Sequence, residues 1–288
     1  MLIPLEPWQV ERVVRIALEE DAPWGDLTSQ TLIPAQSRVV ASLVAREPGI
    51  LSGMALFASA MRLTDSTITV TLKRNDSQSF VAGDLLAVVE GPARAVLQAE
   101  RVALNFVQRL SGIATLTGQF VAELAGTKAR IVDTRKTTPG LRYFERYAVR
   151  CGGGFNHRFS LSDAVMAKDN HLAVLASSFS GSITDALREA RGRLPHTTHV
   201  EIEVDRPDQI EPVLAAAVDT VLLDNFSLAD MQSAVEQIAG RALVEASGSV
   251  RLESVRAIAQ TGVDLISVGA LTHSVRSLDL GLDILSEA

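Results

Sequence analysis

The sequence contains one cysteine, no long apolar run and no excess of positive charge. With Cys151 alone, the chain cannot form an internal disulfide framework, which favours a reducing, cytoplasmic setting. No apolar run reaches the roughly 18 residues that a membrane span needs. Residues 1–11 also lack the basic and apolar pattern of a signal peptide. We therefore expect a soluble, cytoplasmic protein with no membrane partner.

The charge balance excludes a further class of partner. Acidic residues outnumber basic residues by 34 to 27, and the formal net charge is −7. A chain of this sign is not expected to bind nucleic acid as its main partner.

Hydrophobic residues make up 47% of the sequence, which is enough for a full core and argues against disorder. At 288 residues the chain has room for one or two domains.

One stretch, residues 133–171, stands out from this acidic background because it concentrates basic side chains among glycines and turn formers. Three glycines, 152–154, lie near its centre. Its basic or titratable members are Arg135, Lys136, His157, Arg158 and Lys168. A local positive site in a negative protein indicates a small, highly charged anion as the ligand. His157 follows the three glycines and stands between Asn156 and Arg158, which favours a binding role over that of a packed histidine.

The first part of the chain predicts a small α+β layer. Residues 7–20 and 54–63 have helical spacing, and the strand-like runs are 39–45, 67–72 and 85–89. Residues 93–124 predict a long helix with a break near Ser111 and Gly112. Arg101 lies within this helix, and taken alone it is typical of an ion pair on a solvated face. Cys151 is interpreted as a small core or loop residue rather than a nucleophile.

The second part alternates strand-like and helical segments in units of about 20 to 25 residues, a pattern of repeated βα units. The strand-like runs are 129–133, 199–204, 220–224, 242–246 and 264–268, and the helical runs are 183–191, 207–217, 228–239 and 252–260. This alternation favours a (β/α) barrel, complete or incomplete, over a doubly wound open sheet. No Cys/His metal cluster is present in the sequence.

Polar residues gather at the ends of these predicted strands, where barrels place their functional groups. Glu201 and Glu203 share one face of a strand, since side chains two apart point the same way. Buried carboxylates at Glu201, Glu203, Asp224 and Glu245 require partners, which are either the basic residues of 135–168 or a metal ion. Two late strands end in small residues suited to a phosphate group: Ser247-Gly248 and Ser267-Val268-Gly269.

These motifs together resemble the quinolinate phosphoribosyltransferase family over nearly the whole chain. The segments that carry the resemblance are residues 20–28, 100–105, 110–115, 133–142, 153–158, 168–171, 222–226 and 245–248. At Ser249 the family pattern has a second glycine, so this position departs from it. Two alternatives stay open: a related phosphoribosyltransferase-like protein associated with molybdate transport, and a non-catalytic anion-binding protein on a barrel scaffold.

The resemblance implies an α/β fold with an N-terminal α+β sandwich domain and an open, incomplete barrel of about seven strands. The implied limits are 1–115 and 116–271, with 272–288 packing back on the first domain. The implied reaction joins quinolinate and 5-phosphoribosyl 1-pyrophosphate, with Mg²⁺, and gives nicotinate mononucleotide, pyrophosphate and CO2. A homodimer is also implied, in which Arg101 reaches the site of the partner subunit.

The resemblance further implies a role for each site residue. Arg135, His157 and Arg158 would line the quinolinate pocket, and Lys136 and Lys168 would stand at its border with the phosphoribosyl donor. Glu203, rather than Glu201, would hold the magnesium and ribose region together with Asp224. The 5-phosphate would bind at Ser247, Gly248, Ser267 and Gly269. The catalytic set would be Lys136, Lys168, Glu203 and Asp224, while the source of the last proton, Lys136 or His157, stays open.

Overall fold

The computed structural model describes residues 2–178 and 181–285, and they form two compact units. The first contains the chain up to Gly118, Thr138–Gly153 and the segment from Ser274 onwards; the second contains Gln119–Thr137 and Gly154–His273. This division differs from the limits expected from the sequence chiefly in Thr138–Gly153, which belongs to the first unit although it follows the first barrel strand.

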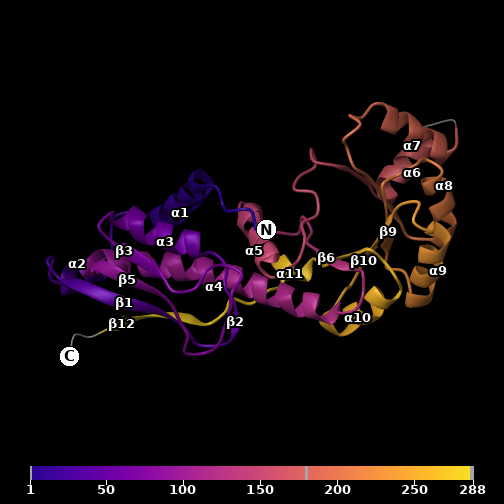
Figure 1. Cartoon of the computed structure of the whole chain (residues 1–288). Coiled ribbons are helices and arrows are strands. Elements are labelled where there is room, and N and C mark those ends of the chain that lie inside the picture. Colours follow the sequence, from indigo (N-terminus) through magenta and orange to yellow (C-terminus); the bar gives the residue numbers. More distant parts are fainter. Residues whose placement is uncertain (1, 179–180, 286–288) are drawn as a thin grey trace. The chain divides into compact units, whose positions relative to one another are not determined.

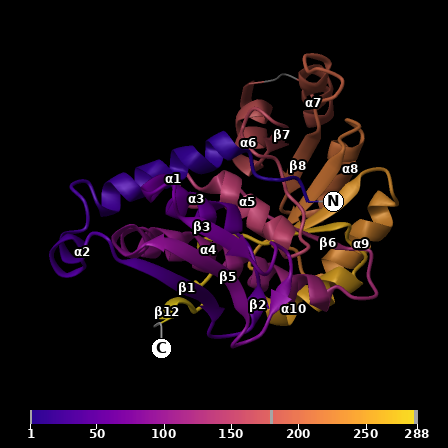
Figure 2. The ribbon, with the colours of Figure 1, turned by 60° about the vertical axis from the view of Figure 1, so that its left-hand side comes forward.

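The first unit is built on a four-stranded antiparallel sheet with helices packed on it (Figures 1 and 2). The strands, in sheet order, are β12 (Leu280–Leu285), β1 (Arg38–Ala45), β5 (Leu85–Pro92) and β3 (Thr69–Leu72). A second, two-stranded ladder pairs β2 (Gly49–Ile50) with β4 (Ser79–Phe80). The helices are α1 (Pro7–Asp21), α2 (Leu27–Leu32), α3 (Met54–Thr64), α4 (Ala93–Glu123) and α5 (Arg142–Cys151).

Apolar spacing explains how these helices pack. Val10 and Val14 lie one turn apart on α1 and are its buried residues. Phe57 of α3, Leu43 of β1 and Leu86 of β5 are fully buried and form part of the core between helix and sheet. The C-terminal strand β12 completes the sheet by pairing antiparallel with β1, so residues 280–285 pack in the first unit, as expected. Residues 286–288 of the expected C-terminal segment lie outside the described part of the chain.

Helix α4 is continuous, so the break predicted near residues 111–112 was wrong. Ser111 is buried, and its hydroxyl accepts a hydrogen bond from the Ser52 backbone N–H (3.1 Å) and donates to the Ser52 carbonyl (3.2 Å). At Gly112 an added Cβ would lie 2.2 Å from the carbonyl oxygen of Arg276. The small residues therefore permit close packing against the helix, which local propensity alone does not reveal.

The second unit contains a six-stranded parallel sheet with helices on its outer side (Figure 1). The strands, in sheet order, are β6 (Arg130–Val132), β11 (Leu265–Ser267), β10 (Leu243–Ser247), β9 (Thr220–Asp224), β8 (Val200–Val204) and β7 (Val165–Ala167). The helices are α6 (Asp169–Ser178), α7 (Ile183–Gly192), the 3₁₀ turn η1 (Pro207–Gln209), α8 (Ile210–Leu214), α9 (Leu228–Ile238), α10 (Leu252–Gln260) and α11 (Ala270–His273).

The strand order decides between the two architectures predicted from the sequence. The first strand, β6, pairs with the last, β11, and β7 to β11 follow in sequence order, as in a barrel. On the other side of β6, Phe155 forms a single parallel bridge with Val132. The ring is open between Phe155 and β7, so the expected open α/β barrel is confirmed, with six strands and one bridge in the described part of the chain. Among the described residues, no helix combines the length and apolarity of a membrane span.

Candidate active site

Two adjoining cavities lie at the C-terminal ends of the barrel strands, the end at which barrels carry their sites. The first, about 310 Å³, is lined by Thr134, Arg135, Lys136, His157, Arg158, Met166, Lys168, Glu203, Leu222, Glu245, Ser247 and Ser267. The second, about 610 Å³, is lined by Thr134, Lys136, Lys168, Glu203, Asp224, Asn225, Ser247, Gly248, Ser249, Val250, Arg251, Ser267, Gly269, Ala270 and His273. The two share six residues and so form one site with two lobes, which we call the cationic lobe and the phosphate lobe.

The cationic lobe brings together Arg135, His157 and Arg158, as the sequence predicted. The Arg158 side chain donates from Nη1 to the carbonyl of Ala164 (2.9 Å), which fixes the direction of its guanidinium. Burial lowers the pKa of Arg158, and the neighbouring Arg135 lowers it further. Two guanidinium groups held near each other in this way repel, and a bound dianion relieves that repulsion.

Asp133 opens the basic stretch, but it supports the site rather than lining either cavity. Its carboxylate is fully buried and accepts hydrogen bonds from Asn156 Nδ2 (2.5 Å) and from the His157 backbone N–H (2.8 Å). The Asp133 backbone N–H also donates to the carbonyl of Phe155 (3.1 Å). These contacts hold the segment after the three glycines against the end of β6, and this places His157 and Arg158 at the cavity.

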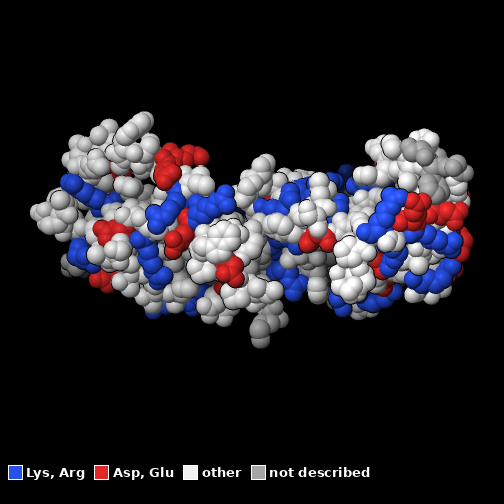
Figure 3. All heavy atoms as spheres, turned by 90° about the horizontal axis from the view of Figure 1, so that it is seen from above, with Lys and Arg blue, Asp and Glu red and all other residues white. Residues whose placement is uncertain are grey.

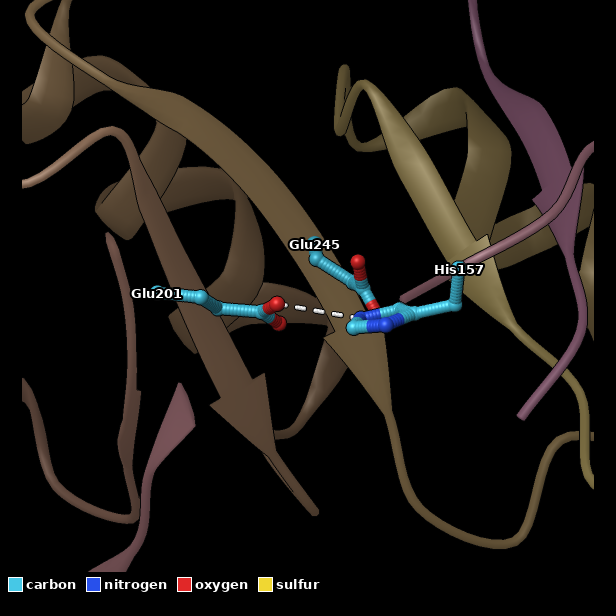
Figure 4. A group of neighbouring side chains, drawn as sticks. All are labelled: His157, Glu201 and Glu245. Carbon is cyan, nitrogen blue, oxygen red and sulfur yellow. Dashed lines mark ion pairs between the residues drawn. The ribbon is translucent and has the colours of Figure 1, made fainter. Parts of the chain in front are cut away.

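The His157 imidazole points with its Nε2 toward two buried carboxyl groups, those of Glu201 and Glu245 (Figure 4). Its Nε2 is 3.0 Å from Glu201 Oε2 and 3.6 Å from Glu245 Oε1, while its Nδ1 accepts the backbone N–H of Arg158 (2.7 Å). An Nδ1 that accepts carries no hydrogen, so Nε2 carries it and donates to Glu201. Burial lowers the pKa of His157, but the hydrogen bond to Glu201 and the charges of Glu245 and Asp133 outweigh burial and raise it overall.

Lys136, Lys168 and Glu203 line both lobes. The resemblance implies such a border position for the two lysines and a place in the magnesium and ribose region for Glu203. Lys168 follows β7, and its Nζ lies 2.5 Å from Glu203 Oε2 on β8. The Lys168 side chain is about half exposed, whereas Glu203 is 11% exposed. The Lys136 carbonyl accepts a hydrogen bond from the Thr272 hydroxyl (2.7 Å), so the loop after β6 is tied to α11.

The phosphate lobe brings Asp224, Ser247, Gly248, Ser267 and Gly269 to one cavity, in agreement with the predicted grouping. At Gly248 the backbone has φ +100°, and an added Cβ would lie 2.2 Å from Asn225 Oδ1, so no other residue fits there without rearrangement. Ser249 also has a positive φ, 47°. At this departure from the family pattern, serine holds a left-handed conformation that a glycine adopts at lower cost.

Sequence reasoning missed several cavity residues. Thr134, Met166 and Leu222 line the cationic lobe, and Arg251 and His273 line the phosphate lobe. Arg251 precedes α10 and His273 ends α11, so their positions after the last strands were the available signal. The two apolar residues gave none, because a cavity-lining apolar side chain in a buried strand has the same pattern as a core residue.

Arg101 and Cys151, which the sequence analysis also considered, lie in the first unit. Arg101 is exposed on α4 and is not among the residues that line the two lobes. It forms no ion pair with the residues that the structure describes, so the ion pair typical of such a position is not present.

Cys151 is buried at the end of α5, with Ser52 Oγ 3.4 Å from its sulfur. Burial raises the pKa of its thiol, which confirms the interpretation as a core residue rather than a nucleophile.

The surface charge agrees with a small-molecule site. On the face shown in Figure 3, Lys and Arg atoms are interspersed with Asp and Glu atoms rather than gathered into one broad basic area. Several surface residues pair locally, for example Arg241 with Glu211 (2.8 Å). Such an arrangement is typical of a solvated surface, not of a face that follows a nucleic-acid backbone.

Comparison with known proteins gives one consistent result. Family models described as quinolinate phosphoribosyl transferase match residues 26–111 (N-terminal domain) and 113–283 (C-terminal domain). A nicotinate-nucleotide pyrophosphorylase [carboxylating] of Mycobacterium leprae is 44% identical over 280 residues, covering 94% of this chain and 95% of that protein. A probable enzyme of the same name from Bacillus subtilis is 41% identical over 276 residues, covering 96% and 93%. The solved structure of the nicotinate-nucleotide pyrophosphorylase from Francisella tularensis superposes with a TM-score of 0.91 at 38% identity, covering 99% of both chains.

Proposed function

The chain belongs to the quinolinate phosphoribosyltransferase family, and from this premise we propose how its cavity residues carry out the reaction. The reaction transfers the phosphoribosyl group of 5-phosphoribosyl 1-pyrophosphate to the ring nitrogen of quinolinate, with loss of CO2. The products are nicotinate mononucleotide, pyrophosphate and CO2. The observation that carries the division of roles is the two-lobed cavity, with cations in one lobe and a carboxylate and small residues in the other.

The cationic lobe holds quinolinate. This substrate is a dianion, and the phosphoribosyl donor carries several further negative charges, so the two repel unless cations separate them. Arg135 and Arg158 offer forked donors that grip a carboxylate at two points, and Met166 and Leu222 supply apolar contact for the ring. With the ring fixed in this way, its nitrogen is directed toward the phosphate lobe.

The phosphate lobe holds the donor. Ser247, Gly248, Ser267 and Gly269 surround the 5-phosphate with backbone and hydroxyl donors, at the ends of the last two strands. As pyrophosphate leaves, the anomeric carbon develops positive charge, and the carboxylates of Glu203 and Asp224 stabilise it. Lys136 and Lys168, which line both lobes, offset the negative charge of the leaving group.

Glu203 and Asp224 are also the residues that would hold Mg²⁺. They line one cavity from neighbouring strands, and this fits an ion that uses one or two carboxylates and takes its other ligands from substrate oxygens and water. Lys168 Nζ lies 2.5 Å from Glu203 Oε2, so this carboxylate already has one cationic partner at the cavity. When bound, the ion would neutralise the pyrophosphate.

Removing one of these carboxylates should weaken Mg²⁺ binding, so that more Mg²⁺ is needed for activity. In Asp224→Asn, the Mg²⁺ concentration for half-maximal activity should rise by ~10-fold or more, since losing a group that holds or orients a metal has an effect of that size. The measurement is a Mg²⁺ titration at a fixed donor concentration. The matched control is Asp230→Asn, at the N-terminus of α9, where Asp230 bonds only with Ser227 in the described structure. An unchanged requirement in Asp224→Asn would remove Asp224 from the metal site.

Decarboxylation follows from the product of transfer. Once the ring nitrogen carries the ribose, the ring is a pyridinium, and its positive nitrogen stabilises the electron pair left when the adjacent carboxylate departs as CO2. No decarboxylation cofactor is required by this chemistry.

The proposal includes a homodimer in which Arg101 of the first unit reaches the barrel of the partner subunit. Support comes from Arg101 itself, an exposed guanidinium that forms no ion pair among the described residues.

We also place the reaction in the cytoplasm, because the chain's one cysteine, Cys151, is a buried thiol.

The overall reaction has a direct test. Purified protein supplied with quinolinate, the donor and Mg²⁺ should release pyrophosphate and CO2 in equal amounts, and nicotinate in place of quinolinate should give neither. Both products are measured in the same reaction, pyrophosphate by a coupled assay and CO2 by trapping from carboxyl-labelled quinolinate. Pyrophosphate release with nicotinate, and none with quinolinate, would assign a different specificity.

A further inference from the structure

A third cavity lies at the opposite end of the barrel. Its volume is about 360 Å³, and its lining includes the first residues of four strands, namely Arg130, Thr220, Leu243 and Leu265. The active-site lobes lie instead at the last residues of the strands, such as Asp224 and Ser247. Three side chains line both this cavity and the cationic lobe: His157, Arg158 and Glu245. These three therefore form the partition between the floor of the active site and the far end of the barrel.

Three carboxyl groups lie near the imidazole of this partition. Glu201 and Glu245 both approach His157 Nε2 (Figure 4), and the Asp133 carboxylate accepts the His157 backbone N–H. Glu201 and Glu245 are 4% and 1% exposed, so water does not screen them. Two carboxyl groups buried side by side disfavour each other's ionised form, so this arrangement favours a retained proton on one of them.

Position singles out Glu245 as the acid of this cluster, because of the three carboxyl groups only Glu245 lines both the cationic lobe and the third cavity. Asp133 accepts hydrogen bonds from Asn156 Nδ2 and the His157 backbone N–H. Glu201 Oε2 accepts one from His157 Nε2, while Glu201 Oε1 has no hydrogen-bond partner in the described structure. Glu245 Oε1 is buried and has no hydrogen-bond partner in the described structure. On the two flanking strands its register partners are Leu222 and Leu265, whose side chains are uncharged, and the hydroxyl of Ser267 on β11 forms a hydrogen bond with the Glu245 side chain. The charged groups that face Glu245 are Asp133 after β6, His157 and Arg158 after Phe155, and Glu201 on β8.

The pKa directions agree with this assignment. Burial, followed by the charge of Glu201, raises the pKa of Glu245 to about 8. The pKa of His157 is raised as well, but a proton on His157 Nδ1 would break its hydrogen bond from the Arg158 N–H (2.7 Å). Because Nδ1 accepts that bond, the extra proton of the cluster belongs on Glu245.

The same hydrogen bond argues against a metal ion at this cluster. The ligand atoms of His157, Glu201 and Glu245 lie within 4.8 Å of one another, a spacing that suits an ion. A metal would need the lone pair of His157 Nε2, but Nε2 carries the ring hydrogen as long as Nδ1 accepts from Arg158. The cluster is therefore arranged to hold a proton.

We propose that Glu245 is the acid that protonates the ring carbon after decarboxylation, and that it is recharged from the cavity at the far end of the barrel. This inference rests on the proposed function. The bond between the ring carbon and the departing carboxylate breaks, CO2 leaves, and the electron pair stays on the ring carbon. That pair takes the Glu245 proton to form the new C–H bond. The Glu245 carboxylate then regains its proton from the bulk solvent by way of the third cavity, which supplies the one proton that decarboxylation consumes, so recharging does not require the product to leave.

The test separates the two halves of the reaction in Glu245→Gln, which keeps the shape of the side chain but has no acidic proton. In a single turnover, pyrophosphate release should stay close to wild type, while CO2 release should slow by on the order of 100-fold, the usual contribution of a positioned general acid. Quinolinate mononucleotide should accumulate, because CO2 returns to the unprotonated carbon. The matched control is Glu145→Gln, another buried carboxylate, which pairs with Arg109 in the first unit and should leave the ratio of the two rates unchanged.

A second measurement uses the wild-type protein, so the test does not depend on how the variant folds. The rate of CO2 release should fall as the pH rises through about 8, because only protonated Glu245 supplies the proton. Pyrophosphate release should not share this decline, and Glu245→Gln should lack it. Equal slowing of both steps in the variant, or a decline shared by both steps in wild type, would overturn the inference. Absence of any pyrophosphate release from quinolinate by wild type would instead overturn the proposed function.

Discussion

Replacing Arg158 by alanine is expected to raise the KM for quinolinate by on the order of 10- to 100-fold, as one lost hydrogen-bonded contact to a carboxylate is worth about 1.5–3 kcal/mol. The KM for the phosphoribosyl donor should change far less. The reason is positional, since Arg158 lines the cationic lobe and not the phosphate lobe. Its guanidinium is directed by the bond to the Ala164 carbonyl, so a neighbouring side chain cannot take its place. The measurement is a pair of substrate titrations, each at saturation of the other substrate.

The matched control is Arg251→Ala. Arg251 carries the same charge but lines the phosphate lobe alone, so its loss should give the reverse pattern, with the larger rise in the KM for the donor. Equal effects of Arg158→Ala on the two KM values would contradict the assignment of the cationic lobe to quinolinate. Together the two variants test whether the two lobes bind different substrates.

The fold was predictable because its signal repeats along the chain. Five of the six barrel strands carry their own apolar pattern and agree with one another, whereas β7, only three residues long, was not predicted. What could not be predicted depends on contacts far apart in sequence. Ser111 and Gly112 looked like a helix break, but they lie in an unbroken helix packed against Ser52 and Arg276. The Phe155 bridge is likewise invisible in the sequence, because a single paired residue has no period.

In the site, too, the positions of residues could be predicted from motif spacing, but the pairs that their side chains form could not. Motif spacing placed Arg135, Lys136 and Lys168 at one cavity, since residues at consecutive strand ends must meet in a barrel. Alternation placed Glu201 and Glu203 on one face, but it could not assign their partners. In the structure Lys168 pairs with Glu203, and His157 pairs with Glu201. Glu203 is therefore a carboxylate of the substrate cavity, whereas Glu201 belongs to the buried cluster around His157. The proton balance of that cluster depends on three segments at once, and no sequence pattern encodes it.

The proposed dimer predicts activity from two inactive proteins. Arg101→Ala and Lys136→Ala should each be nearly inactive, because each removes a cation from every site. If Arg101 serves the partner's barrel, a mixed dimer has one site with both residues intact and one with neither. Random mixing should then restore about one quarter of wild-type activity, since half of the dimers are mixed and each has one working site. The control is a mixture of Lys136→Ala and Arg158→Ala, both on the barrel unit, in which every site lacks one residue and no activity should return. The assay is pyrophosphate release after refolding or co-expression, with the mixed dimer isolated by two different tags. A verified mixed dimer of Arg101→Ala and Lys136→Ala without activity would place Arg101 at the site of its own subunit, or at none.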